Sequence, residues 1–138
     1  MLGRLHTAVR GGGLPKTAPV AIVMKEPGYE ELLQRMASSD PAIGTATLAE
    51  TAIVLSARLQ RDARSLLARF LSEASIALVP FGESHYGATV DAWLRYGKGR
   101  HPAALNFGDC LSYAVARLAN EPLLFVGDDF AQTDIART

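Results

Sequence analysis

The sequence has a single cysteine, no long apolar run and no excess of charge of either sign. With Cys110 alone no internal disulfide can form, which is typical of a reducing cytoplasm. No apolar stretch reaches the roughly 18 residues of a membrane-spanning helix, and the first residues lack the apolar core of a signal peptide. The 14 basic and 14 acidic residues balance, so any affinity for nucleic acid must come from a local patch. We therefore expect a cytoplasmic protein with no membrane partner.

The chain also lacks a Gly-rich phosphate loop of the G-x-G-x-x-G kind. This absence argues against one class of protein, a doubly wound small-molecule binder unrelated to nucleases. What the chain does have is a large apolar fraction: 49% of its 138 residues are hydrophobic, which is enough to close the core of one domain.

The pattern of the chain changes near Thr17. Residues 1–16 contain three consecutive glycines and Pro15, and they show neither helical nor strand periodicity. We expect an atypical N-terminal arm there, followed by one domain over residues 17–138. Within that domain helical periodicity predicts a short helix that stops near Pro27 and further helices over residues 28–39, 47–59, 62–74, 83–96 and 109–119. Short apolar stretches predict strands over residues 41–45, 76–81 and 122–127.

Strands separated by helices imply right-handed crossovers and a mainly parallel sheet that is covered on both faces. The sequence therefore predicts an α/β fold. Such a sheet needs a strand near its middle to begin it, and the residues before Thr17 do not plainly supply one. We expect that strand to be missing.

Four acidic residues, far apart in the sequence, are expected at one edge of this sheet. Glu50 lies in the first turn of the helix after "PAIGT", Asp109 opens another helix, and Asp128 and Asp129 directly follow "PLLFV". Ligands of open parallel sheets bind outside the carboxyl ends of the strands, where the following helices begin. Clustered carboxylates repel one another unless a cation such as Mg²⁺ or Mn²⁺ compensates them. Such a cation can hold a water that attacks a phosphodiester.

Each acid also has a purely structural interpretation. Thr47 and Glu50 match the S/T-x-x-E capping box, and Asp109 suits the positive start of a helix. Asp128 and Asp129 are also common turn formers. Individually these signals are weak, and it is the shared location that favours a metal site.

A basic loop lies just upstream of Asp109. Arg95, Lys98, Arg100 and His101 surround two glycines there, and such groups hold phosphate backbones without reading sequence. The alternative is a solvated charged loop. Beside the acidic cluster, RNA binding is the better prediction.

The stretch "TAIVLSARLQRDARSLLARFL" contains two apolar helices in succession. They offer a groove in which a helical segment of a partner protein could dock. The hydrophobic core explains the same apolar stripes, so both interpretations stay open here.

Several stretches resemble the PIN-domain ribonucleases, in particular the VapC-type toxins of bacterial toxin–antitoxin pairs. They are "YGKGRHPAALNFGDCLSYAVA", "EPLLFVGDDFAQTDI", "TLAETAIVLSARL" and "VAIVMKEPGYEELL", in continuous order over about residues 17–135. The resemblance implies a three-layer α/β/α sandwich with a mainly parallel central sheet. It also implies Mg²⁺- or Mn²⁺-dependent cleavage of tRNA or rRNA that inhibits translation, a homodimer, and a VapB-like antitoxin as partner.

By position, Glu50 matches the second acid of the family, Asp109 the third and Asp129 the fourth. The resemblance therefore implies that these three residues hold the metal and serve as the catalytic residues. Asp128 and Asp134 would support them, although a structural cap for the last segment is an equal interpretation of Asp134.

The start of the chain departs from the family. Relatives begin with a buried strand ending in Asp-x-Ser-Ala, whose Asp is a metal ligand. Here Thr17 and Ala18 stand in place of Ser-Ala, Pro15 stands in place of that Asp, and no acid precedes Glu26. Either residues 1–16 are not the native beginning or the chain has lost this ligand. On the chain as written we expect severely reduced metal affinity and turnover.

The rival hypothesis is a catalytically impaired relative that dimerises and binds an antitoxin without cleaving RNA.

Overall fold

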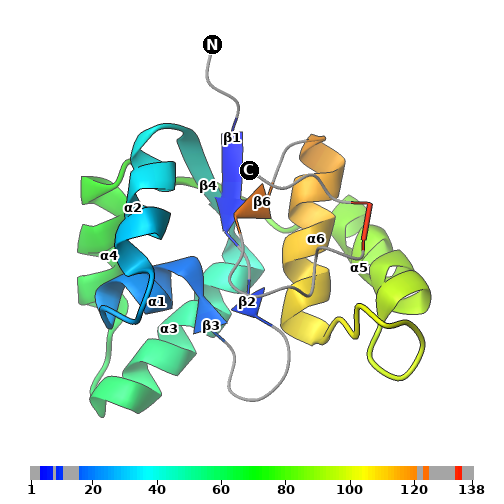
Figure 1. Cartoon of the computed structure of the whole chain (residues 1–138), viewed down its shortest axis with the longest axis horizontal. Coiled ribbons are helices and arrows are strands. Elements are labelled where there is room, and N and C mark those ends of the chain that lie inside the picture. The colour runs from blue at the N-terminus through cyan, green and yellow to red at the C-terminus, as the bar shows by residue number, and fades with distance from the viewer. Residues whose placement is uncertain (1–3, 8, 11–15, 121–122, 125–132, 135–138) are drawn as a thin grey trace.

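A computed structural model describes residues 4–7, 9–10, 16–120, 123–124 and 133–134 (Figure 1). Its centre is a four-stranded parallel sheet in the order β5-β4-β1-β6. The strands are β1 Arg4–Thr7, β4 Asp40–Gly44, β5 Ala77–Val79 and β6 Leu123–Leu124. A parallel sheet with helices between its strands confirms the predicted α/β class.

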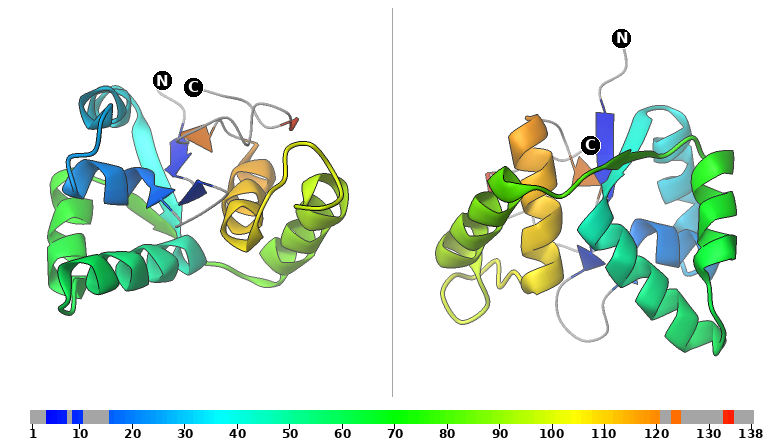
Figure 2. Two further views of the ribbon diagram at one scale, coloured as in Figure 1. Left: turned by 60° about the horizontal axis from the view of Figure 1, so that its bottom comes forward. Right: turned by 180° about the vertical axis from the view of Figure 1, so that it is seen from behind.

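Helices lie on both sides of this sheet (Figures 1 and 2). In the described part of the chain they are α1 Ala18–Val23, α2 Tyr29–Ala37, α3 Thr45–Leu59, α4 Arg64–Glu73, α5 Glu83–Tyr96 and α6 Phe107–Ala119. Helices α1, α2 and α4 gather on one side, and α6 and α5 lie on the other. Helix α3 passes below the carboxyl ends of the strands, where it contacts α1, α4 and α6. Over the described ranges, no helix combines the length and apolar character needed to cross a membrane.

The first strand is present in the structure. β1 pairs in parallel with β4 on one side and with β6 on the other, so it lies in the middle of the sheet. The expectation that this strand is missing is therefore wrong. Backbone hydrogen bonds to neighbours on both sides hold such a strand, so it can form without a strong periodicity of its own. The boundary between an arm and a domain at residue 17 stays a prediction.

A short antiparallel pair follows β1. It consists of β2 Val9–Arg10 and β3 Lys16–Thr17, and it leads directly into α1. β2 contacts α6, and β3 contacts α3, so the pair lies between these two helices, near the lower end of α6 (Figure 1). Pro15 lies between β2 and β3 in the sequence and outside the described residues.

The helices on the α1 side pack as amphipathic helices. Met36 of α2 and Ile43 of β4 are buried together with Ile22, as the predicted apolar stripe requires. Leu33 of the same helix is 42% exposed. The stripe that packs on the sheet side therefore runs through Leu32 and Met36, which lie four residues apart on one face of the helix.

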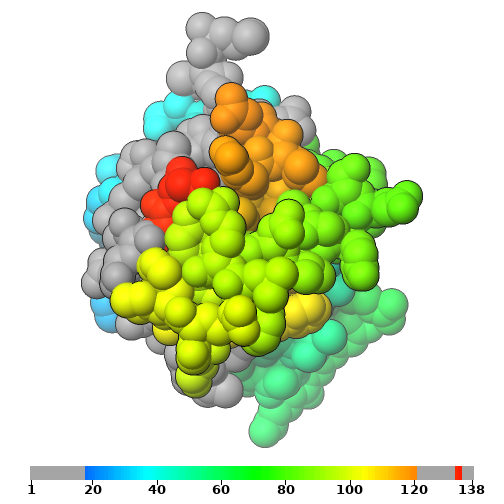
Figure 3. All heavy atoms as spheres, turned by 90° about the vertical axis from the view of Figure 1, so that its right-hand side faces the viewer, coloured from blue at the N-terminus to red at the C-terminus, as the bar shows by residue number. Residues whose placement is uncertain are grey.

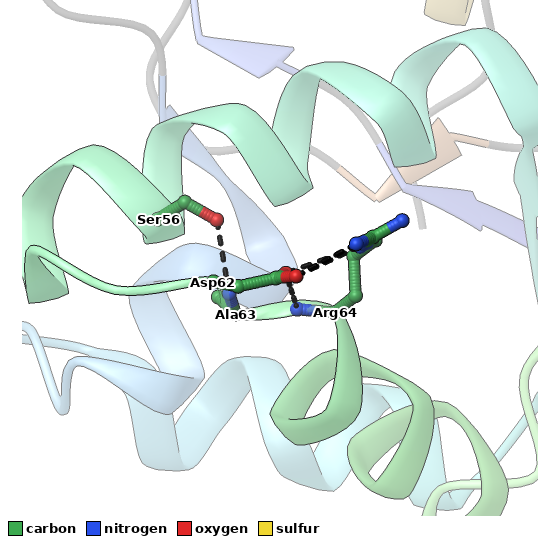
Figure 4. A network of polar contacts seen from close by, with 4 residues as sticks. All are labelled: Ser56, Asp62, Ala63 and Arg64. Atoms are coloured by element: carbon green, nitrogen blue, oxygen red, sulfur yellow. Dashed lines mark hydrogen bonds and ion pairs between the residues drawn. The ribbon is translucent and has the colours of Figure 1, made fainter.

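The turn between α3 and α4 is held by polar contacts (Figure 4). The backbone N–H of Ala63 donates to Ser56 Oγ at 3.0 Å. The Asp62 carboxylate accepts from the backbone N–H and from the guanidinium of Arg64. These contacts set α4 against α3, so that Leu55 and Leu67 meet in a common core.

Strand β5 differs from expectation. It was predicted to be buried, but Leu78 is 50% exposed. The reason is its place at the end of the strand order, because a strand at the edge of a sheet is covered less completely than one in the middle.

Helices α5 and α6 form a hairpin with its own core, in which Tyr96, Leu105 and Tyr113 are buried. The loop between them is closed at its base. Lys98 N–H donates to the Leu105 carbonyl, and Leu105 N–H donates to the Tyr96 carbonyl, both at 2.9 Å. The basic loop is therefore a compact structure attached to the start of α6.

Candidate metal centre

The beginnings of α3 and α6 come together near the carboxyl edge of the sheet (Figure 1). Because α3 begins at Thr45, Glu50 lies in its second turn and not in the first turn as predicted. The decisive contact involves Gly108, which directly precedes Asp109. A Cβ atom added to Gly108 would lie 2.6 Å from Glu50 Oε1 and 2.8 Å from Glu50 Oε2. The Glu50 carboxylate therefore rests against the backbone of α6 at the residue next to Asp109. Glu50 therefore lies beside the residue that precedes Asp109, as the predicted shared edge requires, and their role as metal ligands stays a prediction.

The environment of Glu50 is unfavourable for an isolated carboxylate. Its Oε1 atom is buried and has no hydrogen-bond partner among the residues that the structure describes. Burial raises the pKa of the Glu50 carboxyl above its usual range, because desolvation penalises the charged form. A buried carboxylate oxygen without a donor is a costly arrangement unless a positive group binds it.

The capping interpretation of Glu50 is wrong. The N-cap of α3 is Gly44, so Thr47 lies inside the helix and cannot form the predicted capping box. The helix starts early because β4 runs straight into it. Thr47 instead shares a 3.3 Å hydrogen bond with Ser112 of α6, and both side chains are buried. This bond joins α3 to α6 near Glu50 and Asp109.

Asp109 is completely buried and has the helix-start role that its position suggested. Asn106 is the N-cap of α6, and the two residues form a reciprocal capping box. Asp109 N–H donates to Asn106 Oδ1 at 2.8 Å, and Asn106 N–H donates to Asp109 Oδ2 at 3.0 Å. The cap fixes the orientation of the carboxylate, so the structural and the functional interpretations of Asp109 are compatible.

The remaining predicted ligands cannot be placed. Asp128 and Asp129 lie outside the described residues. Within the described ranges no group of three metal-ligating side chains occurs. The pair formed by Glu50 and Asp109 is therefore the part of the predicted cluster that the described structure contains.

Asp134 lies in a cluster with Tyr113 of α6. The Tyr113 hydroxyl donates to Asp134 Oδ1 at 2.5 Å, and Arg95 and Arg117 lie 3.7 and 3.9 Å from Oδ2. Burial acts to raise the pKa of Asp134, but the Tyr113 hydrogen bond and the two guanidinium groups outweigh it and lower the pKa. These contacts favour the structural interpretation, in which Asp134 anchors the last segment to α6.

Most of the basic side chains in and beside this loop already contact other residues of the chain. His101 Nδ1 accepts from Ala103 N–H at 3.0 Å, and its ring packs edge-on against Tyr96. Arg95 donates to the Tyr96 hydroxyl. Arg100 lies over the Trp93 ring with its guanidinium carbon 4.9 Å from the ring centre. In the described structure, the exposed Lys98 ammonium takes part in no hydrogen bond or ion pair.

Sequence reasoning missed Asn106 and Gly108. The Asn-x-x-Asp spacing in "NFGD" is a capping-box pattern and could have identified Asn106. Gly108 carries no such signal, because its role follows from the approach of a side chain on a distant helix.

Comparison with known proteins decides the family. The profile of the PIN domain matches residues 17–136. The chain belongs to the PIN-domain family.

Curated relatives of this PIN domain cover most of its length. The VapC ribonuclease Mb2004c of Mycobacterium bovis is 46% identical over 121 residues, which are 86% of this chain and 87% of the relative. Ribonuclease VapC of Mycolicibacterium smegmatis is 44% identical over 87% of this chain and 94% of its own length. VapC ribonuclease R02377 of Rhizobium meliloti is 37% identical over 84% and 93% of the two chains.

Replacing Gly108 by Ala tests the contact with Glu50. Alanine in place of an exposed helical glycine usually stabilises by about 0.5–1 kcal/mol. Gly87 of α5 has no atom within 4 Å of an added Cβ, so Gly87→Ala should show this gain. Gly108→Ala should show none or lose stability, because the Glu50 carboxylate must move. Urea unfolding of both variants measures the difference, and equal gains would show that the contact imposes no constraint.

Replacing Glu50 by Gln tests the desolvated carboxylate. Because its pKa is raised on folding, the Glu50 contribution to stability is present below the unfolded pKa and is lost as pH rises through the folded pKa. With a chelator present, Glu50→Gln should therefore be more stable than the parent chain at pH 7. The difference should disappear below about pH 4.

Urea unfolding over this pH range measures the effect. Glu83→Gln, at an exposed glutamate of α5, is the matched control and should change stability little at either pH. A parent chain that is as stable as Glu50→Gln at pH 7 would contradict the desolvation.

Proposed function

We propose that this PIN-domain protein is the toxin of a type II toxin–antitoxin pair, a metal-dependent endoribonuclease that cleaves tRNA or rRNA and so inhibits translation. The observation that carries the proposal is the buried contact of the Glu50 carboxylate with Gly108, next to the buried Asp109. The curated relatives described above are named ribonucleases. A toxin that cuts these RNAs acts in the cytoplasm, where they are found.

The chemistry of the two carboxylates fits a hard divalent cation. Mg²⁺ and Mn²⁺ take oxygen ligands, and the buried Glu50 Oε1 has no donor among the described residues. We infer that Glu50, Asp109 and Asp129 hold the ion, with Asp128 in a supporting role. Asp134, which was predicted to support them too, is bound by Tyr113 and is left to its structural role. When bound, the cation supplies an acidified water as the nucleophile for phosphodiester hydrolysis.

The side chains themselves provide position and charge. The Asn106 cap fixes the Asp109 carboxylate at the start of α6, and the helix contact through Gly108 fixes Glu50 beside it. Lys98 and Arg100 are exposed on the adjoining loop and would hold the RNA backbone. Arg95 and His101 were predicted to do the same, but their contacts with Asp134 and Ala103 support smaller contributions.

The comparisons lend no support to the catalytically impaired alternative. The family match begins at residue 17 and so does not extend to Pro15, which stands where the family's first acid would be. Glu50 and Asp109 both lie within the matched residues and retain the acidic side chains that the chemistry needs.

The proposal includes two protein partners: a second copy of the chain and a VapB-like antitoxin. A groove of about 400 Å³ lies along α3 and the start of α4, lined by Ala52, Ile53, Ser56, Asp62 and Arg64. Ile53 is 70% exposed there, although its neighbours in sequence pack into the core. An exposed apolar side chain in a groove is a suitable anchor for an amphipathic helix of the antitoxin.

Asp109→Asn tests the nuclease. The parent chain should cleave total tRNA or ribosomal RNA with Mg²⁺ or Mn²⁺ and not with a chelator. Replacing a metal ligand should lower the cleavage rate by at least about 100-fold, whereas Asp91→Asn at an exposed position of α5 should leave it unchanged. Gel analysis of the RNA gives the rates. Equal cleavage by Asp109→Asn and the parent chain would refute the assignment.

Ile53→Asp tests the antitoxin groove. Because Ile53 is already largely exposed, a charge there should leave folding and RNA cleavage unchanged. It should abolish co-purification with a co-expressed VapB-like antitoxin, because a charge would be buried against the apolar face of the partner helix. Leu33→Asp on α2 is the control and should still capture the antitoxin. Capture that survives Ile53→Asp would place the antitoxin on another surface.

A further inference from the structure

An apolar pocket beside the metal centre has no role in the function proposed above. It lies between α5 and the first turn of α6 and has a volume of about 310 Å³. Its lining residues are Thr89, Val90, Trp93, Phe107 and Cys110. The two aromatic rings are accessible: Phe107 is 72% exposed and Trp93 is 44% exposed.

The pocket is directly connected to the metal centre through α6. Phe107 immediately precedes Gly108, against which the Glu50 carboxylate rests, and Asp109 is the next residue. Phe107 and Cys110 lie three residues apart on the face of α6 that turns toward α5. Asp109 lies on another face of the same turn. The pocket and the two acids therefore share the same end of α6.

The charge around the pocket suits a nucleic acid strand. The Arg100 guanidinium lies over the Trp93 ring, and Arg100 Nε donates to the Leu94 carbonyl at 3.2 Å. Lys98 is exposed on the same loop. Figure 3 shows the face that α5 and this loop form, with α5 in green and the loop in yellow. Aromatic rings next to cations are the arrangement that binds unpaired bases and their phosphates.

We propose that this pocket holds one unpaired base of the RNA substrate, stacked on Phe107 and Trp93, with Arg100 at the adjoining phosphate. This inference rests on the proposed function. The lining offers Thr89 as its main polar side chain, so recognition depends on the flat face of the base more than on its hydrogen-bonding edge. The pocket therefore selects single-stranded segments over paired ones, without a strong preference for one base.

A second copy of the chain is the competing occupant, because the exposed apolar residues of α5 continue beyond the pocket to Tyr86 and Leu94. The position next to Asp109 and the cation over Trp93 favour RNA.

The test measures binding of RNA in the Asp109→Asn background, where the probe is not cut. The probe is a fluorescein-labelled ten-nucleotide oligoadenylate RNA, in which a single abasic nucleotide is placed at each position in turn. With Phe107 present, one abasic position should raise Kd by about tenfold, the loss of one stacked base. In the Phe107→Ala variant the same abasic position should not raise Kd further, because both changes remove the same stacking interaction.

Tyr86→Ala is the matched control, since it removes an exposed aromatic ring from α5 that does not line the pocket. It should keep the full abasic effect. The proposal is overturned if the abasic effect is unchanged in Phe107→Ala, or if no position shows one. It is also overturned if sedimentation shows that Phe107→Ala and Tyr86→Ala both weaken self-association while RNA binding stays the same.

The outcome is separable from that of the nuclease assignment. An abasic effect that depends on Phe107, together with failure of the parent chain to cleave any RNA, would support the base pocket and refute the nuclease. Cleavage without a Phe107-dependent abasic effect would refute the base pocket alone.

Discussion

The candidate site depends on how closely α3 approaches α6. The Glu50 carboxylate fills the space that a side chain at position 108 would occupy, and the hydrogen bond between Thr47 and Ser112 joins the same two helices one turn away. Two acids from distant parts of the chain are thereby held in a buried environment where a negative charge is poorly solvated. The tight packing gives the site both its geometry and its affinity for positive charge.

The order of strands and helices was enough to predict the meeting of Glu50 and Asp109. Helices that follow parallel strands begin near the carboxyl edge of the sheet, and ligand-binding groups gather there. Helical periodicity predicted α1 to α6 with small shifts at their ends. Strand β1 could not be predicted in this way, because its place is set by hydrogen bonds to β4 and β6 and not by a pattern within Arg4–Thr7.

Individual side chains were harder to predict than elements. The sequence shows that His101 and Arg95 are basic, but not that Ala103 and Asp134 bind them. Likewise Thr47 has the spacing of a cap, but the helix had already begun at Thr45 because β4 leads into it without a loop. These outcomes depend on contacts between segments, and a linear pattern does not contain that information.

The place of β1 has a consequence for the synthesis of the protein on the ribosome. This strand emerges before the other described strands, yet one of its two neighbours in the sheet is β6, near the other end of the printed sequence. Strands that are so far apart in the sequence pair late in folding, because much of the chain between them must be ordered first. A nascent chain therefore cannot complete its sheet until β6 has left the exit tunnel. This delay keeps partly made molecules unfinished while they are still attached to a ribosome.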